Sequence, residues 1–179
     1  RFWLATLVLI AVPDLARAAD RLNVVASFSI LGDFVRNVGG DRVNVTTLVG
    51  PDSDSHVFVP APADAKKVAD AKLVFVNGLG FEGWLSRLLK AAGGKAAVVT
   101  ATAGIAPLKV GSVADPHAWQ SVGNAKIYVA NIRDALVVAA PADAEAFKSN
   151  AAAYLADLDA LGRDLGGASA KIPESRRKV

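Results

Sequence analysis

The two histidines of the chain, His56 and His117, are the residues whose type and setting best suit metal chemistry. Each follows an aspartate by two positions: Asp54 in "DSDSHVF" and Asp115 in "ADPHAW". A neutral imidazole nitrogen binds Zn²⁺ or Mn²⁺, and the other ring nitrogen then needs an acceptor that fixes the ring. The aspartates could supply these acceptors, or they could cap the turns that follow. The pattern predicts a pair of metal ligands, with two exposed loop residues of no particular role as the alternative.

Two ligands do not complete a metal site. Zn²⁺ normally takes about four ligands and Mn²⁺ about five or six, so at least one more carboxylate or histidine is needed from elsewhere. The chain has no cysteine, which excludes zinc–thiolate sites, disulfides and cysteine nucleophiles. Pro116 directly precedes His117, while Pro60 and Pro62 follow His56. These prolines lower the entropy lost when the two loops are ordered.

Other chemistries lack their motifs. The segment "NGLGFEGW" (77–84) contains glycines but not the spacing or the Lys-Ser/Thr ending of a phosphate-binding loop. It is interpreted as a strand-to-helix turn, with Glu82 near the start of the helix. No G-x-S-x-G elbow or hydrolase triad can be recognised, and Lys126 and Tyr128 are predicted on a helix with a solvated charged face. The chain is expected not to be an enzyme; the alternative is a metal-dependent hydrolase that uses the two histidines.

Alternating strand and helix patterns must position these histidines. Short apolar, β-branched runs predict strands at 22–28, 43–49, 72–78 and 95–102. Apolar residues at helical spacing, bounded by glycine or proline, predict helices at 29–40, 62–71, 82–94, 118–139 and from 141 to about 170. Ser29 can cap the first helix, and a loop rich in Gly, Pro and Ala is predicted to run to Pro116. The fold class is α/β, with a parallel four-stranded sheet and helices on both faces.

This fold class places both histidines at one edge of the sheet. Ligands of such folds gather at the carboxyl ends of the strands. His56 follows the second predicted strand, and His117 lies in the loop after the fourth. Their shared edge favours the metal-ligand interpretation over that of two loop residues without a role.

Composition and the first residues narrow the class of protein. Of the 179 residues, 53% are hydrophobic and 21% charged, with a net charge of +3, so the chain can bury a core. Basic runs interleaved with aromatic residues are absent, so nucleic acid is not an expected partner. A basic residue, an apolar run, Pro13 and the Ala-Arg-Ala of 16–18 open the chain. This order predicts a signal peptide at 1–18, cleaved on export to the periplasm.

At this level of detail the sequence resembles a known family. Residues 24–88, from "VVASFSILGDF" to "NGLGFEGWLSRL", together with "ADPHAW", resemble the periplasmic metal-binding proteins of zinc and manganese ABC importers. This cluster A-I solute-binding family includes the zinc-uptake and Tro-type proteins. The resemblance runs from about Leu22 to the chain end. It implies a protein that captures a divalent transition metal and delivers it to a membrane permease, and that is expected to be a monomer.

The resemblance also implies an architecture and a ligand set. The family has two α/β lobes joined by one long, rigid helix, and the metal lies between the lobes. Its two N-terminal histidine ligands correspond to His56 and His117, while a third (His or Glu) and a fourth (usually Asp) come from the second lobe. We therefore expect a signal peptide at 1–18, a metal-binding lobe at 19–140, an interlobe helix at 141–172, and the start of a truncated second lobe at 173–179, with the C-terminal lobe itself absent.

Two features depart from the family pattern. Ser55 stands where proline more often precedes the first histidine, and the segment 104–114 is short and lacks histidine. Many zinc-uptake members carry a histidine-rich acidic loop. Its lack argues against a dedicated zinc scavenger and leaves manganese, or zinc and manganese together, as the expected cargo. A metal-binding adhesin of the same fold is the alternative function.

Overall fold

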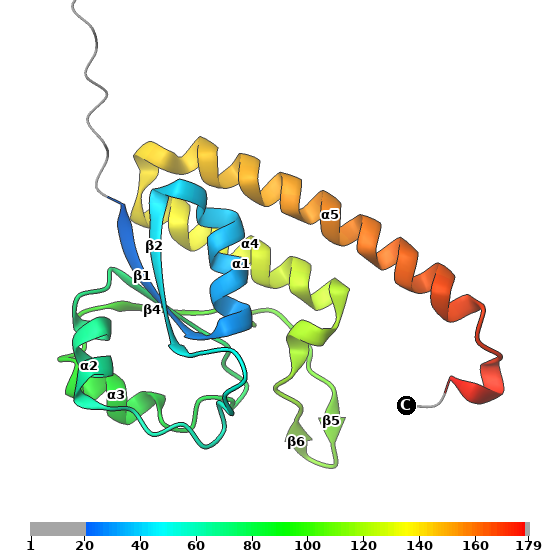
Figure 1. The fold of residues 1–179 in the computed structure, drawn as a ribbon, viewed down its shortest axis with the longest axis horizontal. Helices are drawn as coiled ribbons and strands as arrows, with labels where there is room; N and C mark the ends of the chain where they lie inside the picture. Colours follow the sequence, from blue (N-terminus) through cyan, green and yellow to red (C-terminus); the bar gives the residue numbers. More distant parts are fainter. Residues whose placement is uncertain (1–20, 178–179) are drawn as a thin grey trace, which may run out of the picture.

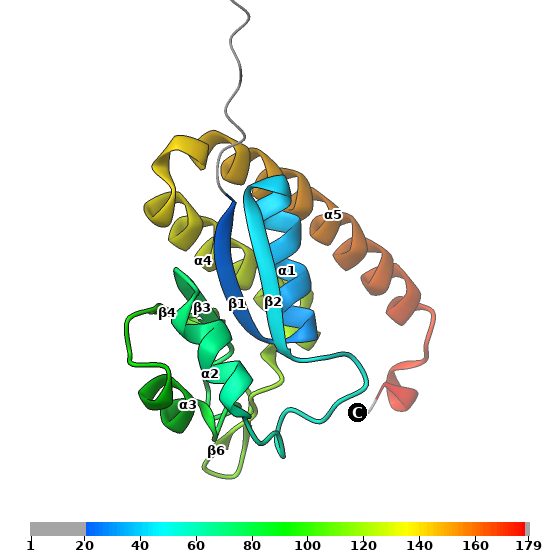
Figure 2. The same ribbon diagram turned by 60° about the vertical axis from the view of Figure 1, so that its left-hand side comes forward.

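A four-stranded sheet with helices on both faces forms the body of the protein, and a long helix runs along one side of it (Figures 1 and 2). The computed structural model describes residues 21–177. The predicted signal peptide at 1–18 lies outside the described residues. Among those described, no helix combines the length and apolar character needed to cross a membrane.

All four strands of the main sheet are parallel and follow the order β2-β1-β3-β4. Their bounds are β1 (Leu22–Phe28), β2 (Val43–Val49), β3 (Leu73–Val76) and β4 (Ala97–Thr100). The two central strands are β1 and β3, and their apolar runs are almost fully buried. Strands covered on both faces need such continuous apolar runs. The predicted sheet is confirmed.

The helices divide between the two faces in the way right-handed crossovers require. The chain moves from β1 to β2 in one direction and then returns past β1 to β3 and β4. Consequently α1 (Ser29–Gly39) covers one face, and α2 (Pro62–Ala69) and α3 (Leu85–Ala91) cover the other (Figure 2). The later helices α4 (Val122–Ala139) and α5 (Ala144–Ala170) pack with α1 and with each other.

The first helix follows β1 without a loop. Phe28 is both the last strand residue and the N-cap position, and no side chain caps the helix, so the expected cap at Ser29 is wrong. The buried side of α1 includes the predicted apolar residues Leu31, Phe34, Val35 and Val38. This uninterrupted strand-to-helix passage starts α1 at the carboxyl edge of the sheet.

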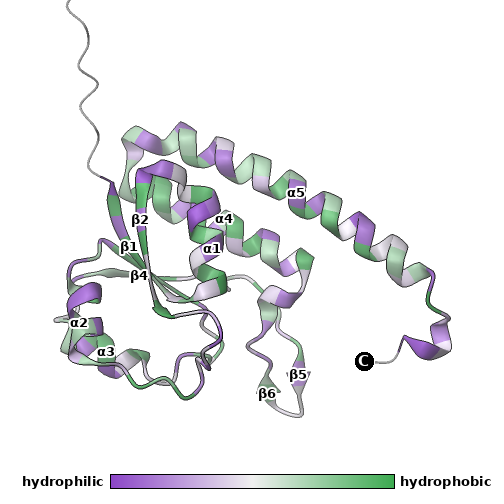
Figure 3. Cartoon of the chain, viewed as in Figure 1, coloured by the Kyte–Doolittle hydropathy of each residue, from purple (hydrophilic) through white to green (hydrophobic). Residues whose placement is uncertain are grey.

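Helix α5 leaves the body of the protein along its length. Near its start, Phe147 and Ala151 are fully buried. Farther along, Leu161 and Leu165 are 46% and 52% exposed, and this part extends past the other elements (Figure 1). Hydrophilic and hydrophobic residues are mixed along it (Figure 3). Leu158 is still buried, so α5 is anchored in the core of the described lobe from its start to about Leu158, and the part beyond is not.

Two local predictions need correction. The predicted loop before Pro116 contains a short antiparallel hairpin, β5 (Lys109–Val110) and β6 (Val113–Ala114), which reverses at Gly111 with φ of 63°. Helix α3 is shorter than predicted, because the chain makes a turn up to Trp84 before the helix begins. Glu82 and Trp84 consequently lie in that turn, where Glu82 bonds to Ser27 on β1 and Trp84 bonds to the carbonyl of Ser55.

Candidate metal site

The two histidines meet at the carboxyl edge of the sheet. The Nε2 atoms of His56 and His117 lie 3.3 Å apart, although the residues are separated by 61 positions in the chain. His56 belongs to the loop between β2 and α2, and His117 immediately precedes the short 3₁₀ helix η2 (Ala118–Gln120). The expectation that both lie at one edge is confirmed.

The spacing of the two nitrogens suits a shared cation. Two ligands at about 2.0–2.1 Å from a tetrahedral Zn²⁺ are roughly 3.3–3.4 Å from each other. Two imidazole lone pairs at this distance repel unless a proton or a cation lies between them. Both rings could therefore bind one metal ion in nearly the positions that they already occupy.

Asp115 fixes the ring of His117. Its Oδ1 accepts a hydrogen bond from the backbone N–H of His117 at 2.9 Å and lies 2.7 Å from the Nδ1 atom. Hydrogen bonds from that N–H and then from the ring lower the pKa of the Asp115 carboxyl group below its usual range. A proton held on Nδ1 leaves the lone pair on Nε2, the nitrogen that faces His56. Asp115 thus acts both as the ring acceptor and as the cap of its turn.

Asp54 has only one of these two roles. Its Oδ1 accepts from the backbone N–H of His56 at 2.8 Å, which is the capping alternative. The loop of His56 is held instead by Trp84, whose Nε1–H donates to the carbonyl of Ser55 at 3.0 Å. Ser55 is buried, so Trp84 anchors the loop directly before the histidine. The sequence showed Trp84 only as an apolar helix residue.

Aromatic rings form the floor beneath the histidines. Phe81 packs against the ring of His56 with 4.9 Å between centroids, and Trp119 packs against the ring of His117 at 5.3 Å. Phe28 contacts both Phe81 and Trp119. A hollow of about 270 Å³ opens beside this floor and is lined by both histidines. The rings limit the rotation of the imidazoles and keep water away from one side of them.

A buried polar cluster lies below the site, and the sequence did not indicate it. Asn77 is fully buried, and its amide Nδ2–H donates to the carbonyl of Pro116 at 2.9 Å. The hydroxyl of Tyr128 donates to the Oδ1 atom of Asn77. Tyr128 is therefore fully buried in this cluster, whereas Lys126 on the same helix is partly exposed and pairs with Asp159 at 2.8 Å.

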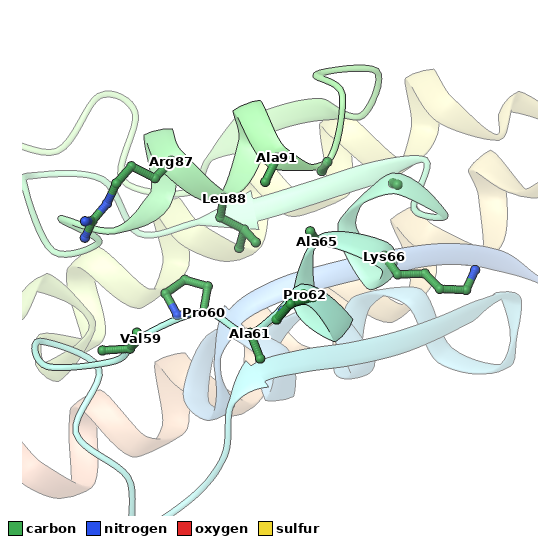
Figure 4. A pocket seen from close by; sticks show the side chains of 11 residues that line it. Val59, Pro60, Ala61, Pro62, Ala65, Lys66, Arg87, Leu88 and Ala91 are labelled. Atoms are coloured by element: carbon green, nitrogen blue, oxygen red, sulfur yellow. The ribbon is translucent and has the colours of Figure 1, made fainter.

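Within residues 21–177, no group of three or more histidine, aspartate or glutamate side chains could hold a metal ion. The described lobe therefore offers a pair of nitrogens, together with Asp115 as their outer partner. The larger hollow of about 660 Å³ lies elsewhere, between α2 and α3 (Figure 4). Its lining is mainly alanine, proline, valine and leucine, with Lys66 and Arg87 at its margin. Neither histidine lines it, so the size of a hollow does not identify the site here.

The sequence of the chain matches a known protein family. Residues 24–179 match the family described as zinc-uptake complex component A periplasmic (ZnuA). The chain is 42% identical over 161 residues to the manganese-binding lipoprotein MntA of Halalkalibacterium halodurans, which covers 89% of this chain and 54% of that protein. It is 36% identical over 164 residues to the iron-binding protein YfeA of Yersinia pestis, covering 89% of this chain and 52% of that protein. The chain thus spans about half the length of the curated relatives it matches.

Solved structures agree in fold. A manganese-bound point mutant of a periplasmic metal-binding protein from Candidatus Liberibacter asiaticus matches with a TM-score of 0.82 and 36% identity, over 88% of this chain and 60% of that one. Zn(II)-bound AdcA from Streptococcus pneumoniae matches with a TM-score of 0.73 and 32% identity, over 80% of this chain and 32% of that one. The expected resemblance is confirmed: the chain belongs to the periplasmic zinc-uptake component A family of metal ABC-importer substrate-binding proteins.

Proposed function

We propose that this chain is the N-terminal, metal-binding lobe of a solute-binding protein that captures Zn²⁺ or Mn²⁺ for an ABC importer. His56 and His117 are the metal ligands that it contributes. The observation that carries this proposal is the 3.3 Å separation of the two Nε2 atoms. The bond between Asp115 and Nδ1 of His117 supports it, since an acceptor on the far ring nitrogen is the usual partner of a metal-bound histidine.

The proposed site is shared between two lobes. Two nitrogens leave about two further positions to fill for Zn²⁺, and more for Mn²⁺. We expect a second lobe to supply a Glu or His and an Asp. The helix expected at 141–172 would connect the lobes, and residues 173–179 would begin the second one. The partly exposed Leu161 and Leu165 of α5 support this, because they offer apolar surface beyond the part anchored in this lobe.

Capture requires the imidazoles to be neutral. Protons compete with the metal for the Nε2 atoms of His56 and His117, so affinity is expected to fall in acid. The aromatic floor and the fixed loops hold the two imidazole rings with their Nε2 atoms 3.3 Å apart. A pre-organised pair loses less entropy when the ion binds, which favours tight capture without a large rearrangement of this lobe.

The remaining parts of the proposal concern place and partners. The family description concerns periplasmic zinc uptake, and the name of one relative describes a manganese-binding lipoprotein; both support a periplasmic location and delivery to a membrane permease. They favour this proposal over an adhesin. We further propose a monomeric protein that performs no catalysis and binds no nucleic acid, with the metal as its cargo.

The test is metal binding by the full-length protein and its histidine variants. His56→Ala and His117→Ala should each lower the affinity for Zn²⁺ and Mn²⁺ in calorimetric titrations by at least about 100-fold, because each removes a direct ligand. Asn37→Ala is the control, since Asn37 is exposed and bonds only to Asp33. Unchanged metal content in both histidine variants would refute the assignment. Turnover of a hydrolysable substrate, abolished by the same variants, would support the hydrolase alternative.

A further inference from the structure

A buried hydrogen-bonded cluster centred on Asn77 lies next to the His117 loop, at the carboxyl end of β3. Asn77 follows β3 and is fully buried. Its Nδ2 atom donates to the carbonyl of Pro116 at 2.9 Å and to that of Gly78 at 3.1 Å. Its Oδ1 atom accepts from the hydroxyl of Tyr128. The side-chain amide therefore has a partner on each side, in a place where water cannot replace a lost one.

These contacts clamp the peptide bond that leads into His117. That peptide consists of the Pro116 carbonyl and the His117 N–H, which lie in one plane. The carbonyl accepts from Asn77 at 2.9 Å, and the N–H donates to Asp115 at 2.9 Å. With both ends of the plane held, the main chain of His117 cannot rotate freely. The direction in which the imidazole leaves the backbone is thereby set.

Tyr128 holds the other end of the Asn77 amide. The carbonyls of Pro116 and Gly78 can only accept, so they require the Nδ2 end of the amide to face them. Burial, and then the nearby charge of Glu82, raise the pKa of the Tyr128 hydroxyl, so it stays protonated. With Nδ2 facing Pro116, this hydroxyl donates to the Oδ1 atom. The phenol on α4 thus stabilises the orientation that holds the loop.

Glu82 ties the same cluster to the other histidine. Its Oε1 atom accepts from the backbone N–H of Asn77 and from the hydroxyl of Ser27, both at 2.6 Å. These bonds close the turn that carries Phe81. The ring of Phe81 packs against His56 with centroids 4.9 Å apart. One buried cluster therefore supports both sides of the pair.

From this geometry we propose that Asn77, held by Tyr128, is a positioning residue for metal binding: it holds the Pro116 carbonyl and so keeps the Nε2 atom of His117 at ligand distance from that of His56. The inference rests on the proposed function. Asn77 does not touch the metal. Its effect is to place one ligand before binding, and its loss should change the geometry of the bound ion as well as its affinity.

Three isosteric variants separate positioning from a general loss of stability. Asn77→Asp replaces the donor at Pro116 by a second acceptor. Tyr128→Phe removes the hydroxyl that holds the Oδ1 end of the amide. Thr102→Val is the matched control, because Thr102 is buried and its hydroxyl donates at 2.5 Å to the backbone carbonyl of Asn77 and not to its side-chain amide. Tyr128→Phe and Thr102→Val each remove one buried hydrogen bond of Asn77, whereas Asn77→Asp removes the two that Nδ2 donates.

The measurement is Co²⁺ binding by the full-length protein, followed by titration and by the visible ligand-field spectrum. Outer partners of metal ligands typically contribute 10–100-fold to affinity, so Asn77→Asp should lose at least about tenfold. Tyr128→Phe should lose about fivefold, the effect of one net hydrogen bond. Both should show a shifted or weakened spectrum, because one ligand is displaced. Thr102→Val should keep the spectrum and stay within about twofold of the wild-type affinity.

The outcomes decide between the proposals. If Asn77→Asp does not fold, the Co²⁺ affinity and spectrum of Tyr128→Phe, compared with those of Thr102→Val, still test the positioning role. Wild-type affinity and spectrum in Tyr128→Phe would overturn the positioning role, and so would equal losses in Tyr128→Phe and Thr102→Val. If instead His117→Ala binds Co²⁺ as tightly as the wild type, the proposed metal site itself is wrong. The two failures are therefore distinguishable.

Discussion

Replacing an aspartate of the site by asparagine should have different effects on metal affinity at the two positions. Asp54 and Asp115 each lie two positions before a histidine and each cap its backbone N–H. Only Asp115 also contacts a ring, at 2.7 Å from the Nδ1 atom of His117. Asp115→Asn should therefore weaken metal binding, whereas Asp54→Asn should leave it almost unchanged.

The size of the effect follows from the contacts. Removing the outer partner of a metal-bound histidine typically costs 10–100-fold in affinity. The side chain of Asp115 is 37% exposed, and asparagine keeps an acceptor oxygen, so Asp115→Asn should lie near tenfold. Asp115→Ala removes the acceptor altogether and should approach 100-fold. Asp54→Asn keeps one acceptor for one backbone N–H, so its loss should stay within about threefold.

The assay is competition between the full-length protein and a chromophoric chelator for Zn²⁺ at neutral pH. Thermal unfolding of each metal-free variant shows whether the variants are equally folded. If Asp54→Asn lowers the Zn²⁺ affinity as much as Asp115→Asn does, the reasoning is refuted, because the contact between Asp115 and the ring would then contribute nothing to affinity. Wild-type affinity in Asp115→Ala would refute it as well.

Three further substitutions test the fold that supports the site. Gly32→Ala should destabilise the protein by about 1–3 kcal/mol in chemical unfolding, because its Cβ would lie 2.3 Å from Thr47 on β2; unchanged stability would contradict this close approach of helix and sheet. Gly166→Ala, with open space around it in α5, should instead stabilise by up to about 1 kcal/mol. Burial is the largest single influence and acts to raise the pKa of Asp64. The hydrogen bonds from Lys67 and from the backbone N–H of Ala61, together with the charge of Lys67, outweigh it, and the pKa lies below its usual range. A lowered pKa contributes stability that is present above the ordinary aspartate value and lost as the pH falls through the folded one, so Asp64→Asn should cost about 0.5–1 kcal/mol at pH 7 and progressively less in acid. A cost that does not change with pH would refute this assignment.

Much of the fold could be predicted because its signals are local. In β1 and β3 the apolar residues follow one another without a polar alternation, so both faces of each strand are buried. Such continuous runs are typical of parallel sheets. The alternation with helices then sets the order of the crossovers and the edge at which loops meet. His56 and His117 could be placed together from this reasoning, without any distance being known.

Local signals failed where the outcome depended on distant partners. Trp84 and Glu82 looked like the start of a helix, but they lie in a turn whose contacts come from the loop before His56 and from Ser27 on β1. Tyr128 is predicted, with Lys126, on a helix that has a solvated charged face. The structure buries it, and its hydroxyl bonds to Asn77, 51 positions away.

The sequence by itself determined an α/β sheet with two histidines at one edge, because strand burial and crossover handedness depend on patterns within single elements. Tertiary structure alone decided that the Nε2 atoms lie 3.3 Å apart and that Asp115, but not Asp54, reaches a ring. The two aspartates occupy equivalent positions in the chain. What differs is the packing around each histidine, and packing is set by side chains that come together only when the whole lobe has folded.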